Sequence, residues 1–176
     1  MNEHRTPEEQ QALDAQYMAL ALEEARAAGA AGEVPIGAVV VYEPIDPGTR
    51  RPTSEARVIA AACNRRETDA DPAGHAEFLA MKAAAESLGV WRLTGCTVYV
   101  TLEPCLMCAG LMHQSRVDRC VFGAFDPKAG ALGSLYQVNA DERLNHNFAV
   151  EGGVREGECA NLLREFFAER RAARKK

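Results

Sequence analysis

Two cysteines three positions apart, Cys105 and Cys108, follow a proline in the stretch LEPCLMCAG (102–110). A pair with this spacing can form a redox disulfide, supply half of a zinc site or be two ordinary core residues. If a helix begins at Pro104, the two sulfurs share one face of it. The free N–H groups and the positive dipole end of the first turn then favour thiolate over thiol. The function of the pair depends on which other side chains reach it.

A second motif, GHAEF (74–78), places His75 and Glu77 in the first turn of another expected helix. The 26 residues between Glu77 and Pro104 are enough for a helix and a return strand. If both helices begin at the same edge of a sheet, His75 reaches the two cysteines. One imidazole and two thiolates suit a tetrahedral zinc ion, and three protein ligands with a fourth position open indicate a catalytic site.

Glu77 lies two residues beyond His75 and on a helix points about 200° away from it. The first turn can still direct its carboxylate at a water in the open metal position. Zinc lowers the pKa of such a water to about 7, and a neighbouring carboxylate can accept its proton and pass it on. His113, on the same expected helix as the cysteines, is predicted to point elsewhere because it lies about 80–140° round the helix from them.

The elements that position these residues alternate between strands and helices. A capping box at residues 6–9 precedes a helix that runs to Gly29. Strands are expected at 35–43, 56–63, 96–102, 119–125 and 148–153, and further helices at 71–89, 104–115 and 158–172. The pattern predicts an α/β fold: a three-layer α/β/α sandwich with a mixed, roughly five-stranded sheet, mixed because its first two strands form a hairpin.

The composition is that of an ordinary globular protein. The chain has 176 residues, 47% of them hydrophobic and 26% charged, which predicts a single domain over residues 1–176. No apolar run is long enough for a membrane span, and the polar N-terminus lacks a secretory stretch, so a cytoplasmic location is the default expectation. In a reducing cytosol the other four cysteines are expected to be buried free thiols: Cys63, Cys96, Cys120 and Cys159.

Charge is unevenly distributed along the chain. Residues 1–33 hold seven acidic residues against two arginines, whereas the last eight residues, ERRAARKK, hold five basic residues and one acidic residue. The overall charge is −5. Such a basic end suggests a polyanionic partner, and the alternative is a solvated, frayed terminus. Residues 170–176 are predicted to be a basic, flexible tail.

Taken together, these motifs resemble those of the bacterial tRNA-specific adenosine deaminases, within the cytidine deaminase superfamily. The H-x-E and P-C-x-x-C motifs belong to the superfamily as a whole. The stretches EVPIGAVVV (33–41) and DPKAGALGSL (126–135), with the basic terminal helix, are similar to the tRNA enzymes in particular. The similarity extends through CTVYVTLEPCLMCAG, LNH and ECANLLREFFAERR, so it covers nearly the whole chain.

The resemblance implies a cytidine deaminase-like fold and one Zn2+ per subunit, bound by His75, Cys105 and Cys108, with Glu77 as proton shuttle. It also implies hydrolysis of the wobble adenosine of a tRNA anticodon to inosine with release of ammonia. The expected substrate is the anticodon stem-loop, in bacteria typically of an arginine tRNA, and the expected assembly is a homodimer.

The resemblance further assigns residues to substrate binding. Asn64 would hold the flipped nucleotide, the backbone around Ala76 would face the base, and Glu33, Val34, Pro35 and Ile36 would wall the pocket. Basic residues on or after the last helix, and two that flank the fourth strand, are the candidates for RNA contact: Arg116, Lys128, Arg164, Arg170, Arg171 and Arg174.

Two features depart from the family pattern, and other interpretations remain open. The connection at residues 43–56 looks long and could alter the RNA-facing rim, and His113 stands where an aliphatic residue is expected. A sister deaminase acting on a free base or nucleotide (guanine, cytosine or a pterin-like precursor) would share the metal motif but has no use for a cationic helix. A zinc-stabilised RNA-binding module would leave Glu77 idle, and a thiol redox protein would leave His75 and Glu77 unexplained.

Overall fold

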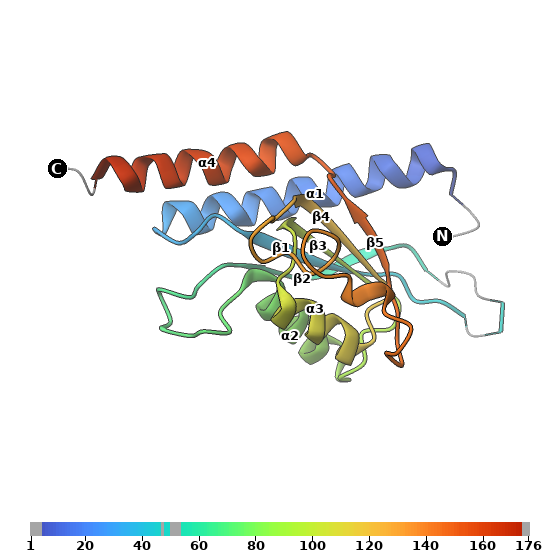
Figure 1. Ribbon diagram of the computed structural model, residues 1–176. Coiled ribbons are helices and arrows are strands. Elements are labelled where there is room, and N and C mark those ends of the chain that lie inside the picture. Colours follow the sequence, from blue (N-terminus) through green and yellow to red (C-terminus); the bar gives the residue numbers. More distant parts are fainter. Residues whose placement is uncertain (1–4, 47, 50–53, 174–176) are drawn as a thin grey trace.

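Four helices and five strands make up the computed structural model, which describes residues 5–46, 48–49 and 54–173 (Figure 1). The helices are α1 (Pro7–Ala30), α2 (Ala76–Leu88), α3 (Leu106–Ser115) and α4 (Glu156–Ala173). The strands are β1 (Gly37–Tyr42), β2 (Arg57–Cys63), β3 (Cys96–Leu102), β4 (Arg119–Ala124) and β5 (Ala149–Gly152), and a short 3-10 turn spans Val138–Ala140.

The five strands form one mixed sheet in the order β2-β1-β3-β4-β5. β1 pairs antiparallel with both β2 and β3, whereas β3, β4 and β5 run parallel. Because β3 and β4 are parallel, the chain that follows each of them leaves at the same edge of the sheet. The end of β2 lies at that edge too, since Cys63 pairs with Gly37 and the neighbouring Ala38 pairs with Val100.

Helices cover both faces of the sheet, which confirms the predicted three-layer α/β/α sandwich. α1 and α4 lie on one face, and α2 and α3 lie on the other (Figure 1). Successive strand residues point to opposite faces. Thus Val39, Tyr99 and Val121 pack under α1 and α4. Their neighbours Val40, Val98 and Phe122 belong to the core that α2 and α3 cover.

A buried ion pair ties α1 to the sheet. Asp14 of α1 is 2% exposed and accepts two hydrogen bonds of 2.7 Å from the guanidinium of Arg119, at the start of β4. The Tyr99 hydroxyl donates to the same carboxylate over 2.9 Å, and so does the Gln10 amide. All four groups lie on one face of the sheet, so the carboxylate joins one helix to two strands.

Several predicted boundaries shift by a few residues. α2 begins at Ala76 rather than near Asp71, because Asp71 instead closes a turn in which its side chain accepts from the Ala73 amide. It ends at Gly89, whose φ of 67° is the left-handed value that favours glycine. α3 begins at Leu106, two residues after Pro104.

The terminal helix differs from its prediction at both ends. α4 begins at Glu156, earlier than the expected residue 158, and extends through Ala173. The basic tail predicted to start at residue 170 is therefore helical up to residue 173, and residues 174–176 lie outside the described residues. None of the described helices has both the length and the apolar character needed to cross a lipid bilayer.

The long connection between β1 and β2 lies away from the edge at which β3 ends. Tyr42, at the end of β1, pairs with Cys96, at the start of β3. The connection therefore leaves the sheet at the opposite edge from Cys105. Residues 47 and 50–53 of this connection lie outside the described residues.

Candidate active site and metal centre

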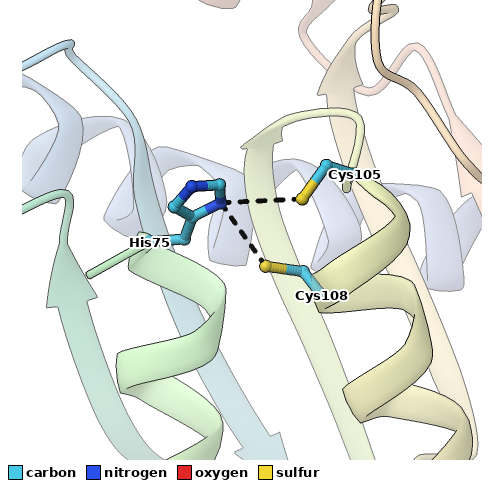
Figure 2. Close-up of side chains that lie close together, drawn as sticks. All are labelled: His75, Cys105 and Cys108. Atoms are coloured by element: carbon cyan, nitrogen blue, oxygen red, sulfur yellow. Dashed lines mark hydrogen bonds between the residues drawn. The ribbon is translucent and has the colours of Figure 1, made fainter. Parts of the chain in front are cut away.

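His75, Cys105 and Cys108 converge at the edge of the sheet where β3 ends. The Nδ1 atom of His75 lies 3.7 Å from the Cys105 sulfur and 3.6 Å from the Cys108 sulfur (Figure 2). The three potential ligand atoms all lie within 4.8 Å of one another. Figure 2 shows the imidazole at the start of α2, facing both sulfurs at the start of α3. The juxtaposition expected from the sequence is therefore present.

The two helix beginnings explain how three side chains can point at one place. His75 is the N-cap of α2 and Cys105 is the N-cap of α3, both with extended backbone conformations. N-cap side chains often bond to their own helix, but neither of these makes a capping hydrogen bond, so both are directed outward. Cys108 lies one turn into α3 on the same side. The local backbone thus presents one nitrogen and two sulfurs to a shared point.

The spacing of these atoms fits a tetrahedral zinc ion. Bonds of about 2.3 Å to sulfur and about 2.0–2.1 Å to nitrogen, at the tetrahedral angle, separate a nitrogen from a sulfur by about 3.6 Å. The two Nδ1–sulfur separations are 3.7 and 3.6 Å. Imidazole and thiolate are also the ligands that zinc prefers. Both the donor types and their separations therefore suit this ion.

The electrostatics of the three groups favour a bound cation. A hydrogen bond from Cys108 lowers the pKa of Cys105 to about 3, and a hydrogen bond with Cys105 raises the pKa of His75. The same interaction between the two sulfurs raises the pKa of Cys108. Thiolate is the form in which cysteine binds metal, so the lowered pKa of Cys105 suits a metal ligand.

Glu77 lies beside this cluster and is 5% exposed. Burial raises the pKa of its carboxyl group, and its interaction with the Cys108 thiol opposes that effect. Glu77 belongs to the first turn of α2, as predicted, and thus shares its helix beginning with His75. A carboxyl group at this position can exchange protons with a small molecule that reaches the cluster.

A buried pair, Asn64 and Glu33, lies at the same sheet edge. Asn64 is 3% exposed, follows β2 directly and donates from its amide nitrogen to Glu33 over 3.0 Å. The backbone amide of Thr68 donates to the other oxygen of Glu33 over 2.6 Å. Burial alone would raise the pKa of Glu33, but the hydrogen bonds from Thr68 and Asn64 outweigh it and hold the pKa below its ordinary value.

The other residues expected in the pocket lie close to this pair in the chain. Ala76 and Pro35 are buried, whereas Val34 and Ile36 are partly exposed. The carbonyl of Ile36 accepts a hydrogen bond from the Asn64 backbone amide over 2.9 Å, which joins segment 33–36 to the end of β2. A single buried network therefore holds this segment and Asn64 together.

Four of the predicted RNA-contact residues are exposed, three on α4 and one on the loop after β4. Exposed Arg164, Arg170 and Arg171 lie along α4, and Arg170 reaches the carbonyl of Gly32, next to Glu33. Lys128 is exposed on the loop after β4, two residues before Gly130, which pairs with Cys105. These four residues lie on segments that adjoin the site.

Arg116 is placed differently. It caps the C-terminal end of α3, where its guanidinium donates to the His113 carbonyl over 2.8 Å. This end lies about 15 Å along the helix from Cys105. Arg174 lies outside the described residues.

Among the described residues, the other two histidines and the other four cysteines lie outside the cluster. His113 is buried and bonds through Nδ1 to the His146 carbonyl over 3.0 Å, and His146 bonds through Nε2 to the Val117 carbonyl over 2.8 Å. The predicted orientation of His113 away from the cysteines is thus confirmed. All six cysteines are free thiols, and Cys96, Cys120 and Cys159 are buried as expected, whereas Cys63 is partly exposed.

One residue beside the cluster was not singled out from the sequence. Glu103, between the end of β3 and Pro104, is 2% exposed, and its carboxylate accepts hydrogen bonds from the loop at 126–134. The sequence shows only that a charged residue stands between an apolar strand and a proline. The hydrogen bonds of Glu103 could not be predicted from this, because the donors are backbone amides more than twenty residues away.

Comparison with known proteins identifies relatives over nearly the full length of the chain. The model of the MafB19-like deaminase family matches residues 13–171. A Bacillus subtilis protein named tRNA-specific adenosine deaminase is 47% identical over 162 residues, which cover 92% of this chain and 93% of the relative.

Two solved deaminase structures also match most of the chain. A structure from work on A-to-I editing by tRNA:A34 deaminases at the wobble position of transfer RNA superimposes with a TM-score of 0.73 and 41% identity. The match covers 84% of this chain and 99% of the chain in that structure. A guanine deaminase from Nitrosomonas europaea superimposes with a TM-score of 0.66 and 30% identity, over 88% of this chain and 84% of its own. Both resemblances extend over most of the chain.

Proposed function

Since the chain belongs to the family of bacterial tRNA-specific adenosine deaminases, we propose that it hydrolyses the wobble adenosine of a tRNA anticodon to inosine and releases ammonia. The observation that carries this proposal is the convergence of His75, Cys105 and Cys108 beside buried Glu77. A redox pair would need only the two cysteines, and a purely structural metal site would not need the carboxyl group. We further propose that the whole chain acts as one catalytic domain.

In this proposal His75, Cys105 and Cys108 hold one zinc ion per subunit. When bound, zinc acts as a Lewis acid that makes a water molecule nucleophilic near neutral pH. Glu77 takes a proton from the attacking water as the oxygen bonds to C6 of adenine, and delivers it to N1 of the ring. The proton of the new C6 hydroxyl group then passes through the Glu77 carboxyl group to the departing amino group, the C6–N6 bond breaks, a C6 carbonyl forms, and ammonia leaves.

The residues next to the cluster would bind the base. We propose that Asn64 hydrogen-bonds to the flipped nucleotide, since its amide nitrogen is already directed by Glu33 and its amide oxygen can still accept. The backbone around Ala76 would face the base, and the segment Glu33, Val34, Pro35 and Ile36 would form the wall. The anticodon loop is single-stranded, so turning its base outward costs less than opening a duplex.

Charged side chains around the site would bind the rest of the anticodon stem-loop. We propose that Lys128, Arg164, Arg170 and Arg171 contact phosphates, because they are exposed on segments that adjoin the site. We propose Arg174 as a further phosphate contact. The position of Arg116 at the far end of α3 supports a structural role for it instead. An arginine tRNA in the cytoplasm would be the natural substrate.

A homodimer is also part of the proposal. Apolar side chains that are 37–53% exposed lie on α3 and on the chain after β4, segments that the Cys105–Gly130 pairing joins. We propose that a second copy of the chain buries this surface, because an exposed apolar patch is typical of a protein–protein interface. The side chains are Leu106, Met107, Phe125, Leu135 and Tyr136.

The direct test is an activity assay with competing substrates. The zinc-loaded protein is incubated with an anticodon stem-loop that carries a wobble adenosine and, separately, with free adenine, guanine and cytosine. The proposal predicts that inosine forms in the stem-loop only. Deamination of a free base without conversion of the stem-loop would instead assign the protein to the sister enzymes. Binding of the stem-loop without conversion would indicate an RNA-binding module.

A further inference from the structure

The carboxylate of Glu103 lies inside a loop that wraps around it. Residues 126–134 supply backbone hydrogen bonds to both of its oxygens: Asp126 donates over 3.0 Å, Leu132 over 3.1 Å and Ser134 over 2.9 Å. The Ser134 hydroxyl donates as well. Backbone amides that converge on an anion form a nest, and here the anion is part of the protein. Glu103 thus joins three residues of this loop to the end of β3.

The fit of this loop around Glu103 is close. A Cβ atom on Gly130 would lie 2.3 Å from the Glu103 carboxyl carbon, so only glycine allows the approach. The two carboxylate oxygens of Glu103 together accept four hydrogen bonds from this loop.

The same loop connects the cluster to the molecular surface. The Ala131 amide donates to the Pro104 carbonyl over 2.8 Å, and Gly130 pairs with Cys105. On its outer side the loop carries exposed Lys128. Glu103 lies between these two sides and contacts neither the expected ligands nor solvent. Its burial prevents direct contact with RNA, so an effect on RNA binding would pass through the loop to which it is bonded.

We propose that Glu103 is a positioning residue that fixes loop 126–134 for RNA binding. The inference rests on the proposed function, because it assigns Lys128 to the RNA. Its carboxylate holds the loop so that Lys128 meets the substrate backbone, while the cluster and Glu77 carry out the chemistry. Loss of the carboxylate should weaken binding of the stem-loop more than it slows conversion of the bound substrate.

The variant Glu103→Gln keeps the size of the side chain but turns one acceptor oxygen into an NH2 group that faces N–H donors. The prediction is a rise of about tenfold or more in KM for the stem-loop, a kcat within about threefold of wild type, and an unchanged zinc content. Glu142→Gln, which removes the same charge from an exposed position, should leave both constants unchanged. A fall in kcat as large as the rise in KM, together with loss of zinc, would overturn the proposal. An unchanged KM would overturn it too.

A double-mutant cycle separates positioning from general damage. If Glu103 acts by placing Lys128, Lys128→Ala should raise KM in the wild-type protein and have little further effect in Glu103→Gln. Independent, multiplicative effects would contradict the proposal. If Glu103→Gln does not fold, Ser134→Ala tests the positioning role instead, because it removes one hydrogen-bond donor to Glu103 and keeps the carboxylate. It should raise KM about threefold without changing kcat, and an unchanged KM would again overturn the proposal.

Separate measurements test the positioning role of Glu103 and the proposed function. The proposed function is tested by the wild-type protein alone, through inosine formation in the stem-loop. The positioning role is tested by comparing variants that all retain conversion. Hydrogen exchange adds a readout independent of RNA: the amides of Leu132 and Ser134 should exchange faster in Glu103→Gln than in wild type. Unaltered exchange would contradict the role.

Discussion

Single residues at helix beginnings carry the chemistry of this site. His75 and Cys105 are N-caps, positions more often occupied by Ser, Thr, Asp or Asn, which bond back to the helix. Their side chains are directed at each other instead, and Cys108 adds the third donor. The motif spacing predicted this convergence because a helix beginning restricts where a side chain can point. The same spacing could not reveal Glu103, whose partners are distant backbone amides.

The first prediction at the residue scale concerns Glu77. Replacement by Gln keeps its size but removes proton transfer, so inosine formation should fall by about 10²–10⁴-fold. The zinc content should stay at about one per chain, because Glu77 is not among the three ligands. Glu86→Gln, at an exposed position on the same helix, is the matched control and should keep full activity. An active Glu77→Gln variant would show that another group moves the proton.

A second residue-scale prediction concerns Glu33 and pH. Its pKa is held below the ordinary value of 4.5, so the ionised form stabilises the folded state. This contribution is fully present above pH 4.5 and is lost as the pH falls through the lower folded-state pKa. The gap in unfolding free energy between wild type and Glu33→Gln should therefore be largest near neutral pH and shrink below pH 4.5. Urea titrations at pH 7, 5, 4 and 3 measure it, and a constant gap would contradict the assignment.

At the scale of elements, the type and order of helices and strands were predictable from the sequence, and the boundaries were less so. Alternating apolar residues and glycine stops located the strands and the end of α2. The start of α2 was misplaced because Asp71-Pro72 has the same local chemistry in a turn as at a helix beginning. The register that brings the ends of β2 and β3 together depends on long-range pairing, which short motifs do not encode.

The Asp14–Arg119 ion pair gives a prediction at this scale. Asp14→Ala should lower the free energy of unfolding by about 3–5 kcal/mol, because it leaves a largely buried guanidinium and the Tyr99 hydroxyl without their partner. The Glu23→Ala change at an exposed position on α1 should have no measurable effect. Urea denaturation compares the two variants. Equal stability of Asp14→Ala and wild type would mean that the ion pair contributes nothing to the attachment of α1.

For the whole molecule, charge distribution explains how an acidic protein could bind RNA. The chain carries a net charge of −5, yet its last eight residues, the end of α4 and the three residues after it, hold five basic residues and one acidic residue. Arg170 lies near Gly32, so the basic end of α4 adjoins the segment proposed to wall the pocket. Composition alone left a frayed terminus as an alternative. The helical structure through Ala173 and its proximity to this segment favour a binding role.

Truncation tests this role. Deletion of residues 170–176 should weaken binding of the stem-loop and flatten its dependence on salt, because fewer counterions are released when fewer phosphates are contacted. Conversion of saturating substrate should change little, since the deleted residues are not part of the cluster. Filter binding between 50 and 200 mM salt provides the slopes. An unchanged slope would exclude this end of α4 as an RNA contact.

X-ray absorption spectroscopy of the zinc-loaded protein examines most directly the coordination on which the proposed chemistry depends. We predict about one zinc per chain, bound by two sulfurs at about 2.3 Å and by one nitrogen and one further light atom at about 2.0–2.1 Å. Substitution of His75, Cys105 or Cys108 by Ala should abolish this signal along with inosine formation. A fourth protein ligand that completes the coordination sphere, or a Cys105–Cys108 disulfide in the active protein, would contradict the proposed zinc coordination.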